Sequence, residues 1–411
     1  MKDRVSSFLR WSQKYTRTDM AYVIKGGFWL TFSRAAVSTV SFLTMVVFAH
    51  FLSKENYGTY QFVVSGLGLF SIFTLSGINT SLVKSIAQRK EGSFRPAVKE
   101  KMKWGLIGTF LSLGLAGWYF LHGNNLLTMA FLMVAIFVPF KETFSVFAAF
   151  WTGRKKFDPQ AKYQAISATL SAIVLIPTIY LTDNVIVIVA VFLAGDTFFD
   201  WLFYRKTISQ LSNDEQDPTT ISFGKNLTLM NALSTAAGYL DKIIVWQFLG
   251  AAPVAIYTFA QLPIQKITNL LPISVLSLPK LSENKIDKKR KKGIISKFLW
   301  LSIFTISAAM VLALIAPFLY KLIFPRYIES IKYFQALSAL IALSPFLLLN
   351  ATLIAEMKEK ALYIINTGVP LIKIILFFIF IPHFEIWGII VAILISEILR
   401  GLLTLHFFLK I

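Results

Sequence analysis

Apolar runs of about twenty residues recur along the whole length of this chain, separated by short polar stretches. A helix needs about 20 such residues to cross the hydrocarbon of a bilayer. A helix also satisfies its backbone hydrogen bonds internally, as lipid requires. The pattern therefore predicts an all-α polytopic membrane protein with about 12 transmembrane helices. The expected spans are 26–51, 61–86, 104–121, 125–150, 164–182, 184–204, 225–249, 254–278, 296–319, 331–354, 360–381 and 386–408.

The composition agrees with this class. Hydrophobic residues make up 56% of the chain and charged residues only 15%, and the mean hydropathy is +0.64. Soluble domains carry about 25% charged residues, so a soluble globular fold is excluded. The chain has no cysteine and only four scattered histidines, which excludes disulfides and thiol catalysis and argues against a metal site. We expect no cofactor.

The basic residues orient the predicted helices. Of the 41 Lys and Arg residues, 31 lie on the side of the N-terminus, four on the opposite side and six within spans. Lys and Arg accumulate in cytoplasmic loops, so both termini are expected in the cytoplasm. The net charge of +20 would suggest nucleic acid in a soluble protein, but the chain lacks the aromatic and basic patterns of nucleic-acid modules. We therefore expect membrane lipids as partners and no nucleic acid.

Two basic segments each have two interpretations. Residues 1–25 fit an amphipathic helix in the cytoplasmic interface, or a frayed tail. The run at 285–293 either lies against anionic lipid headgroups or is a solvated loop.

A short corner sequence occurs twice, as "AHFLSKENYGTYQF" at 49–62 and "WQFLGAAPVAIYTF" at 246–259. One offset aligns both corners and maps the first span onto the seventh. The chain is thus predicted to form two parallel, pseudo-symmetric lobes of six helices, at 26–207 and 225–411, with a cytoplasmic linker at 208–224. Tyr57 and Tyr60 are expected in the aromatic belt at the outer interface.

Charged residues inside spans are costly and are therefore candidates for function. The candidate cations are Arg34, Lys84, Lys141, Lys242, Lys266 and Lys373. The candidate acids are Glu142, Asp196, Asp200, Asp241 and Glu397. A cavity lined by cations at these depths suits an anionic substrate, and a diphosphate is a natural ligand of Arg and Lys.

Several of these charges also have structural interpretations. Lys84 lies near a span end, where it can reach the interface. Asp196 and Asp200 share a helical face and can neutralise a basic partner such as Arg34 or Arg205. Lys373 and Glu397 lie at similar depth and can pair.

Adjacent residues point about 100° apart on a helix. Lys141 and Glu142, and likewise Asp241 and Lys242, are therefore not self-contained ion pairs, and at least one member of each needs another partner. Lys266 lies between Pro263 and Pro272, which are expected to break its helix beside a cavity.

The segments "KGGFWLTFSRAAVSTVSFLTMVVFAHFLSKENYGTYQFV" (25–63) and "YLDKIIVWQFLGAAPVAIYTFAQLPIQKI" (239–267) resemble polysaccharide flippases. These are the O-antigen and capsule repeat-unit translocases of the multidrug/oligosaccharidyl-lipid/polysaccharide exporter superfamily. The first segment resembles the family's opening helix and corner, and the second resembles its seventh helix.

The resemblance implies a V-shaped pair of six-helix lobes that works by alternating access in the inner membrane of a bacterium. It implies movement of an undecaprenyl-diphosphate-linked oligosaccharide to the outer leaflet, driven by an H+ or Na+ gradient. Arg34, Lys141, Lys242, Lys266 and Lys373 would engage the substrate, and the five acids would couple ions or pair with these charges. A polysaccharide polymerase and chain-length machinery would be further partners.

Two alternatives remain open. A multidrug or other exporter of the same fold would be expected to carry an acidic residue in the first span, where this chain has Arg34 and no acid. A membrane-embedded polymerase or acyltransferase would need a longer outer loop. No GxxxxGK[ST] loop is present, so direct ATP hydrolysis is not expected and the chain is predicted not to be an enzyme.

Overall fold

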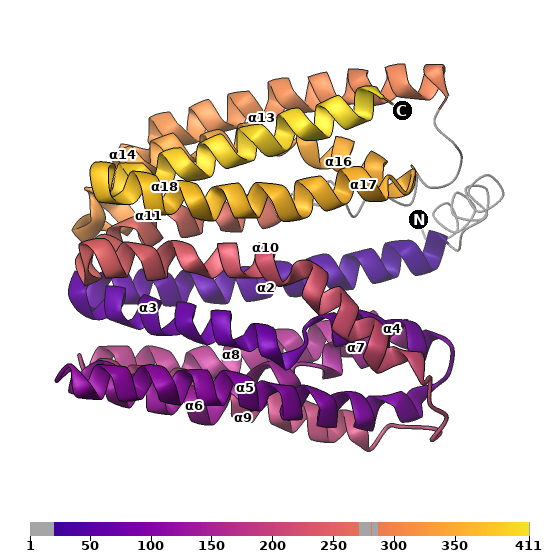
Figure 1. The fold of residues 1–411 in the computed structure, drawn as a ribbon, viewed down its shortest axis with the longest axis horizontal. Helices are drawn as coiled ribbons and strands as arrows, with labels where there is room; N and C mark the ends of the chain where they lie inside the picture. Colours follow the sequence, from indigo (N-terminus) through magenta and orange to yellow (C-terminus); the bar gives the residue numbers. More distant parts are fainter. Residues whose placement is uncertain (1–19, 271–280, 282–286, 411) are drawn as a thin grey trace, which may run out of the picture.

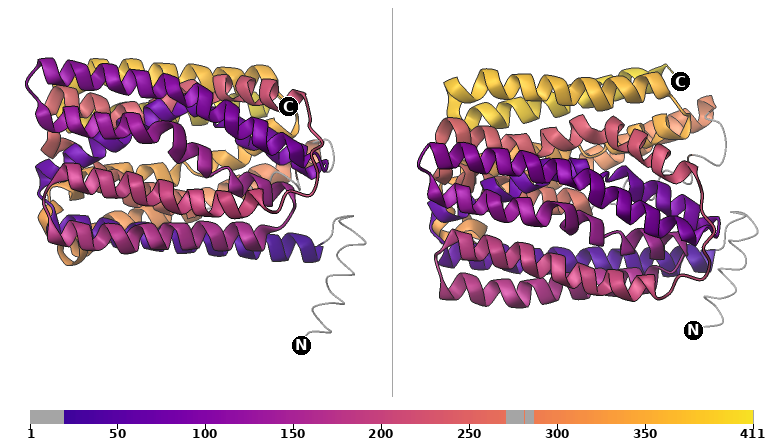
Figure 2. Two further views of the ribbon diagram at one scale, coloured as in Figure 1. Left: turned by 90° about the horizontal axis from the view of Figure 1, so that it is seen from below. Right: turned by 60° about the horizontal axis from the view of Figure 1, so that its bottom comes forward.

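The computed structural model describes residues 20–270, 281 and 287–410, and the regular elements in these ranges are all helices. Long helices run side by side along one axis (Figure 1). Both described chain ends lie at the same end of this bundle, in every view (Figure 2). This arrangement requires an even number of crossings, as the sequence predicts.

The first half of the chain forms one group of helices, the N-lobe. Its elements are α2 (Met20–Phe51), α3 (Lys54–Phe70), η1 (Ser71–Thr74), α4 (Gly77–Ala87), η2 (Glu91–Ser93), α5 (Phe94–Leu121), α6 (Asn125–Phe144), α7 (Phe147–Gly153), α8 (Phe157–Leu181) and α9 (Val185–Ile208). Within the lobe α5 packs on α6, α2 on α8, and α9 on both α6 and α8.

The second half forms the C-lobe. Its elements are α10 (Thr219–Leu249), α11 (Ala251–Leu270), α13 (Lys288–Ile323), η3 (Pro325–Tyr327), α14 (Ser330–Leu337), α15 (Ala339–Ala342), α16 (Phe346–Ala355), α17 (Glu359–Tyr363), the π-helical turn η4 (Ile364–Gly368) and α18 (Val369–Leu409). The helix α18 reverses direction at Glu385 (φ 53°, ψ −131°), so its two halves lie side by side as two helices (Figure 1).

Each predicted span coincides with a helix or a bent pair of helices, although the last residues of span 254–278 lie outside the described residues. Within the described ranges, seven helices are long and apolar enough to cross a membrane, or up to nine if two bent pairs each count as one span. One of the seven, Glu359–Leu409, contains the reversal at Glu385. The all-α membrane architecture is confirmed, and twelve crossings with cytoplasmic termini stay a prediction.

The helix ends differ from the prediction at the end of the bundle that holds the described chain ends. α2 already begins at Met20 and α5 at Phe94, so α5 includes residues that the charge pattern assigned to a loop. α11 continues through Pro263 without a break, which contradicts the helix break expected there. Pro272 lies outside the described residues.

The two repeated corners are the turns between α2 and α3 and between α10 and α11, at the same end of the bundle. Ser53 caps α3 by accepting a hydrogen bond from the amide of Asn56 (3.1 Å), and Gly250 turns the chain at φ 87°. The two corners pack closely against each other. A Cβ atom added at Gly58 would lie only 1.9 Å from the carbonyl oxygen of Ala251. Only glycine permits this approach of the two lobes.

Tyr57 and Tyr60 are not in an interfacial belt. Their exposed fractions are 1% and 5%, and Tyr57 packs on Phe259 of the other lobe with ring centroids 4.8 Å apart. Phe259 in turn stacks on Tyr327. These rings join the lobes at the end of the bundle opposite the described chain ends, and Lys54 and Glu329 add an ion pair of 3.0 Å across the same interface.

At the end of the bundle that holds the described chain ends, α10 bends toward α4 and leaves the other C-lobe helices (Figure 1). The amide of Gly77 donates to the Thr228 hydroxyl (3.0 Å), so this half of α10 is attached to the N-lobe.

The linker ahead of α10 is fixed to the N-lobe as well. The Ser212 amide donates to Glu91 (2.8 Å), and the Asp217 amide donates to the Ser93 hydroxyl (2.8 Å). Thr219 donates through its amide and its hydroxyl to the Asp217 carboxylate, which holds the pKa of that group below its ordinary value.

Candidate functional site

Most of the charged residues inside the bundle lie in two groups, one in each lobe. In the N-lobe, Lys141 of α6 makes an ion pair of 2.9 Å with Asp196 of α9. Its ammonium group also lies 4.9 Å from the centre of the Phe192 ring. Lys141 is therefore the basic partner of Asp196, in place of Arg34 or Arg205.

Two more carboxylates complete the N-lobe cluster. Asp200, one turn after Asp196, accepts a hydrogen bond of 2.7 Å from Ser167 of α8. Glu142 follows Lys141 and, within the described ranges, its carboxylate makes no ion pair or hydrogen bond. One lysine thus faces three acids, and this excess of negative charge suits a proton.

Lys101 is a buried cation that the sequence interpretation missed, because it counted this residue among loop charges. Its side chain is fully buried in α5 and donates to Asn79 Oδ1 (3.1 Å). The sequence does contain a pattern that indicates the burial of Lys101. Lys101 continues the helical spacing of Phe94, Ala97 and Val98, which form the buried face of α5.

In the C-lobe, the adjacent residues Asp241 and Lys242 both lie in the interior of α10. Asp241 is only 1% exposed and accepts hydrogen bonds of 2.8 Å each from Tyr257 and Gln261 of α11. Lys242 Nζ lies 3.8 Å from the Asp241 carboxylate. The prediction that one member of this pair needs another partner is confirmed, and the partners of Asp241 are a hydroxyl and an amide. The two residues also lie within ion-pair distance of each other, which their adjacent positions did not predict.

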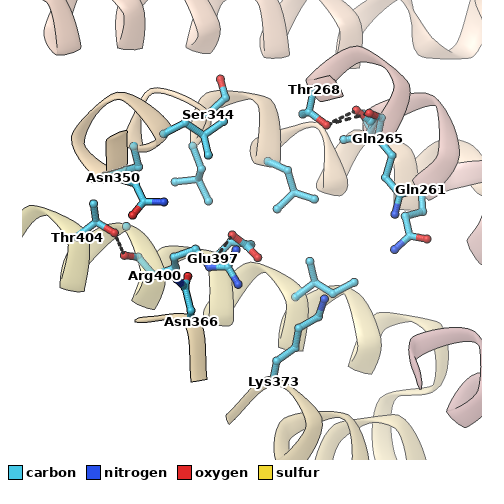
Figure 3. A pocket seen from close by; sticks show the side chains of 17 residues that line it. Gln261, Gln265, Thr268, Ser344, Asn350, Asn366, Lys373, Glu397, Arg400 and Thr404 are labelled. Carbon is cyan, nitrogen blue, oxygen red and sulfur yellow. Dashed lines mark hydrogen bonds and ion pairs between the residues drawn. The ribbon is translucent and has the colours of Figure 1, made fainter. Parts of the chain in front are cut away.

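Next to Gln261 a cavity of about 290 Å³ opens between α11, α16 and α18 (Figure 3). Its charged lining residues are Lys373 from the first half of α18 and Glu397 and Arg400 from the second. Figure 3 shows that side chains from these helices and from the η4 turn converge on one space. Arg400, assigned by the charge pattern to the cytoplasmic end, is a second residue that the sequence interpretation missed.

The ion pair between Lys373 and Glu397, which was the structural interpretation of these two charges, does not form. Glu397 lies 3.6 Å from Arg400 on the next turn, and Lys373 makes no ion pair with any described residue. The nearest aromatic neighbour of the Lys373 ammonium is Phe377, at 5.5 Å from its ring centre. Glu397 therefore pairs with Arg400, three residues later on the same helix, and not with Lys373 on the other half of α18.

The two leading cations of the sequence interpretation stand apart from these clusters. Arg34 is exposed on α2 beside Ser33, which is buried and donates to Gln164 of α8 (3.4 Å). Lys266 is half-buried on α11 and is absent from the cavity lining. Neither makes an ion pair or a hydrogen bond with another described side chain, so both can meet a ligand.

Lys84 lies 5.4 Å from the centre of the Phe223 ring, in the last turn of α4. Among the residues that the structure describes, no group of His, Asp and Glu side chains could hold a metal ion.

Comparisons with known proteins give one family and one fold. The model of the family described as "Polysaccharide biosynthesis protein" matches residues 23–285. A protein of Shigella flexneri described as "Putative O-antigen transporter" is 23% identical over 296 residues, which cover 66% of this chain and 69% of that protein.

Two solved structures have the same fold. An outward-facing multidrug resistance MATE family transporter of the MOP superfamily superposes with a TM-score of 0.68 at 12% identity, over 94% of this chain and 95% of that one. The lipid II flippase MurJ, in an inward closed conformation, gives 0.66 at 17% identity, over 93% and 87% of the two chains. At these identities the likeness concerns the fold.

Proposed function

Because the chain belongs to the polysaccharide biosynthesis protein family, we propose that it is a flippase for lipid-linked oligosaccharides of surface polysaccharide assembly. Its substrate would be an undecaprenyl-diphosphate-linked repeat unit of O-antigen or capsule, moved from the cytoplasmic to the outer leaflet of a bacterial inner membrane. The observation that carries this proposal is the family match, together with a two-lobed fold shared with a lipid II flippase.

The contacts between the lobes support alternating access. The aromatic seal around Tyr57, Phe259 and Tyr327 joins the lobes at the outer end. At the cytoplasmic end, the contacts between the two lobes that the described helices make come mainly from α10. This asymmetry fits a transporter that is closed to the outside and receives its substrate from the cytoplasmic leaflet.

The cations give the substrate a place to bind. Arg34 and Lys266 have no partner among the described residues, and Lys373 has no acidic partner within ion-pair distance. Arg34 and Lys266 would attract the diphosphate when it enters, and Lys373 would act on the substrate from the lining of the cavity between α11, α16 and α18. Lys141 and Lys242 lie beside carboxylates, so they would act on the substrate only if those pairs open.

An ion gradient would drive the cycle. The N-lobe cluster of Lys141 with Glu142, Asp196 and Asp200, and the C-lobe acids Asp241 and Glu397, are the candidate sites for H+ or Na+. Protonation of a carboxylate beside Lys141 would release that lysine and couple ion binding to the substrate site. Polymerase and chain-length machinery would take up the product.

Gene deletion in the source cell tests the proposal. Lipid-linked repeat units should accumulate in the cytoplasmic leaflet, and surface polysaccharide should disappear. Complementation with Arg34→Gln or Lys266→Gln should restore much less polysaccharide than the wild-type gene at equal membrane abundance, whereas Lys84→Gln should restore it fully. Unchanged surface polysaccharide together with raised drug sensitivity would instead identify a multidrug exporter.

A further inference from the structure

The cavity between α11, α16 and α18 has apolar walls into which several uncharged polar side chains project. Its amides are Gln261 and Gln265 of α11, Asn350 of α16 and Asn366 of η4 (Figure 3). We propose that this cavity binds one sugar unit of the lipid-linked oligosaccharide through these amides. The inference rests on the proposed function and adds a sugar subsite that lies apart from Arg34 and Lys266.

Side-chain amides are suited to sugar hydroxyls because each offers a donor and an acceptor on the same planar group. A ring with neighbouring hydroxyls presents the complementary set. Ile264, Leu343 and Phe346 line the same cavity and provide an apolar wall for the C–H face of a ring. Such a mixture of apolar walls with a few convergent polar groups is typical of small-molecule sites.

Two of the amides carry buried acceptors that no described residue satisfies. These atoms are Gln261 Oε1 and Asn350 Oδ1. Gln261 is only 6% exposed, and its amide nitrogen donates to Asp241 and to Tyr257, which fixes the orientation of the group. An unpaired buried acceptor costs roughly 1–3 kcal/mol, so a ligand that donates hydrogen bonds there would be favoured.

The charges around the cavity largely offset one another. Lys373 and Arg400 contribute two positive charges and Glu397 one negative charge. Asp241 behind Gln261 is offset by the adjacent Lys242. A metal ion would be repelled by both cations, and a diphosphate would meet a carboxylate. A neutral polyol gains hydrogen bonds without either cost.

The position of Asn366 is a further indication. It lies in the π-helical turn Ile364–Gly368, and such turns occur often at functional sites. The cavity volume of about 290 Å³ is near the lower end of ligand pockets, about 300–1,000 Å³. The cavity is therefore of a size for a single unit of the sugar chain.

Binding to the purified full-length protein in nanodiscs tests this inference. The two probes are the lipid-linked oligosaccharide extracted from cells without the gene and undecaprenyl diphosphate without sugar. In the double variant Asn350→Leu/Asn366→Leu, affinity for the sugar-bearing lipid should fall roughly ten-fold, as the loss of two hydrogen bonds implies. Affinity for the bare lipid should stay unchanged.

Controls separate this effect from misfolding. Leucine at 350 removes an unpaired acceptor, so the melting temperature should not fall. Gln335→Leu removes a C-lobe amide outside the cavity, whose side chain donates to Ala313 (2.9 Å), and should bind both lipids like the wild type. If the double variant does not fold, Gln265→Leu alone carries the same test.

Equal affinity of wild type and variant for both lipids would overturn the sugar subsite. An equal loss for both lipids would also overturn it, since the cavity would then hold the diphosphate or support the fold. If the wild-type protein binds neither lipid, the proposed function itself fails, and the inference fails with it.

Discussion

Lys141 shows how the interior charges of this protein depend on one another. Its ion pair with Asp196 joins α6 to α9, and Glu142 and Asp200 place two more acids nearby. The side chains of Lys141 and Asp196 are 18% and 27% exposed, so water screens them only in part. The lysine therefore holds together a group of carboxylates that would otherwise repel one another.

We predict that Lys141→Gln destabilises the protein more than Asp196→Asn. Removal of the lysine leaves three acids without a cation, whereas removal of Asp196 leaves Lys141 beside two acids. The loss for Lys141→Gln should be roughly 1–3 kcal/mol, between the values for exposed and buried pairs. Thermal unfolding of the purified variants in one detergent measures it.

The matched control is Lys162→Gln. Lys162 pairs with Asp158 at 3.0 Å, but the two side chains are 54% and 42% exposed. This change should stay within about 0.5 kcal/mol of the wild type. A larger loss at Lys162 than at Lys141 would contradict the assignment of the cluster.

Sequence reasoning selected the charged residues but not their partners. Asp196 and Asp200 were expected to neutralise a cation, and they surround Lys141 rather than Arg34 or Arg205. The partner depends on how α6, α8 and α9 rotate against one another, and a single sequence carries no information on that rotation. Lys101 was missed because it was counted as a loop charge, although the spacing of the apolar residues places it on the buried face of α5.

Among the helices, the turns between α2 and α3 and between α10 and α11 were predicted as equivalent corners. Their turns and their shared end of the bundle are confirmed. Their direct contact at Gly58 and Ala251 could not be predicted, because it depends on how the lobes meet. The same contact explains why Tyr57 is buried, although tyrosine at a helix end usually indicates an interface with lipid.

Linking the lobes at this outer contact should stop transport. The double variant Lys54→Cys/Glu329→Cys places thiols on the two partners of the ion pair between the lobes. A short bifunctional maleimide should join them and block transport, because the outer end could no longer open. Surface polysaccharide in treated and untreated cells measures the effect, and the absence of native cysteines avoids side reactions.

A link within one lobe is the control. Asn56 donates to the carbonyl of Asp183 (2.9 Å), and both residues belong to the N-lobe at the same end. Linked Asn56→Cys/Asp183→Cys should transport normally. Full transport with the lobes linked at 54 and 329 would contradict alternating access at this end.

The positions of the helix breaks could not be predicted from the sequence either. The bends between η1 and α4 and between α15 and α16 are 46° and 40°, and Leu75 adopts φ 58° at the first. Long apolar runs predict that a segment crosses, since hydrophobicity is a sum over the segment. They do not predict where neighbouring helices bend it, because bending depends on contacts.

For the whole molecule, the charge distribution makes a definite prediction of topology. Single cysteines at Gly123 and Asp183 should react with an impermeant maleimide in intact spheroplasts. Single cysteines at Asn213 and Lys360 should react only after the membrane is opened. Labelling of Asn213 from outside would reverse the orientation, and labelling of Gly123 and Asp183 on opposite sides would contradict the predicted number of crossings between them.

The central claim is that this fold moves a sugar-bearing lipid between leaflets. The most direct measurement uses purified protein in proteoliposomes that contain the extracted lipid-linked oligosaccharide in both leaflets. A sugar-oxidising reagent outside should reach about half of the lipid in empty vesicles, and nearly all of it within minutes when the wild-type protein is present. Vesicles with Arg34→Gln should resemble empty ones. If the wild-type protein leaves half of the lipid protected under every imposed H+ or Na+ gradient, the chain is not a flippase for this lipid.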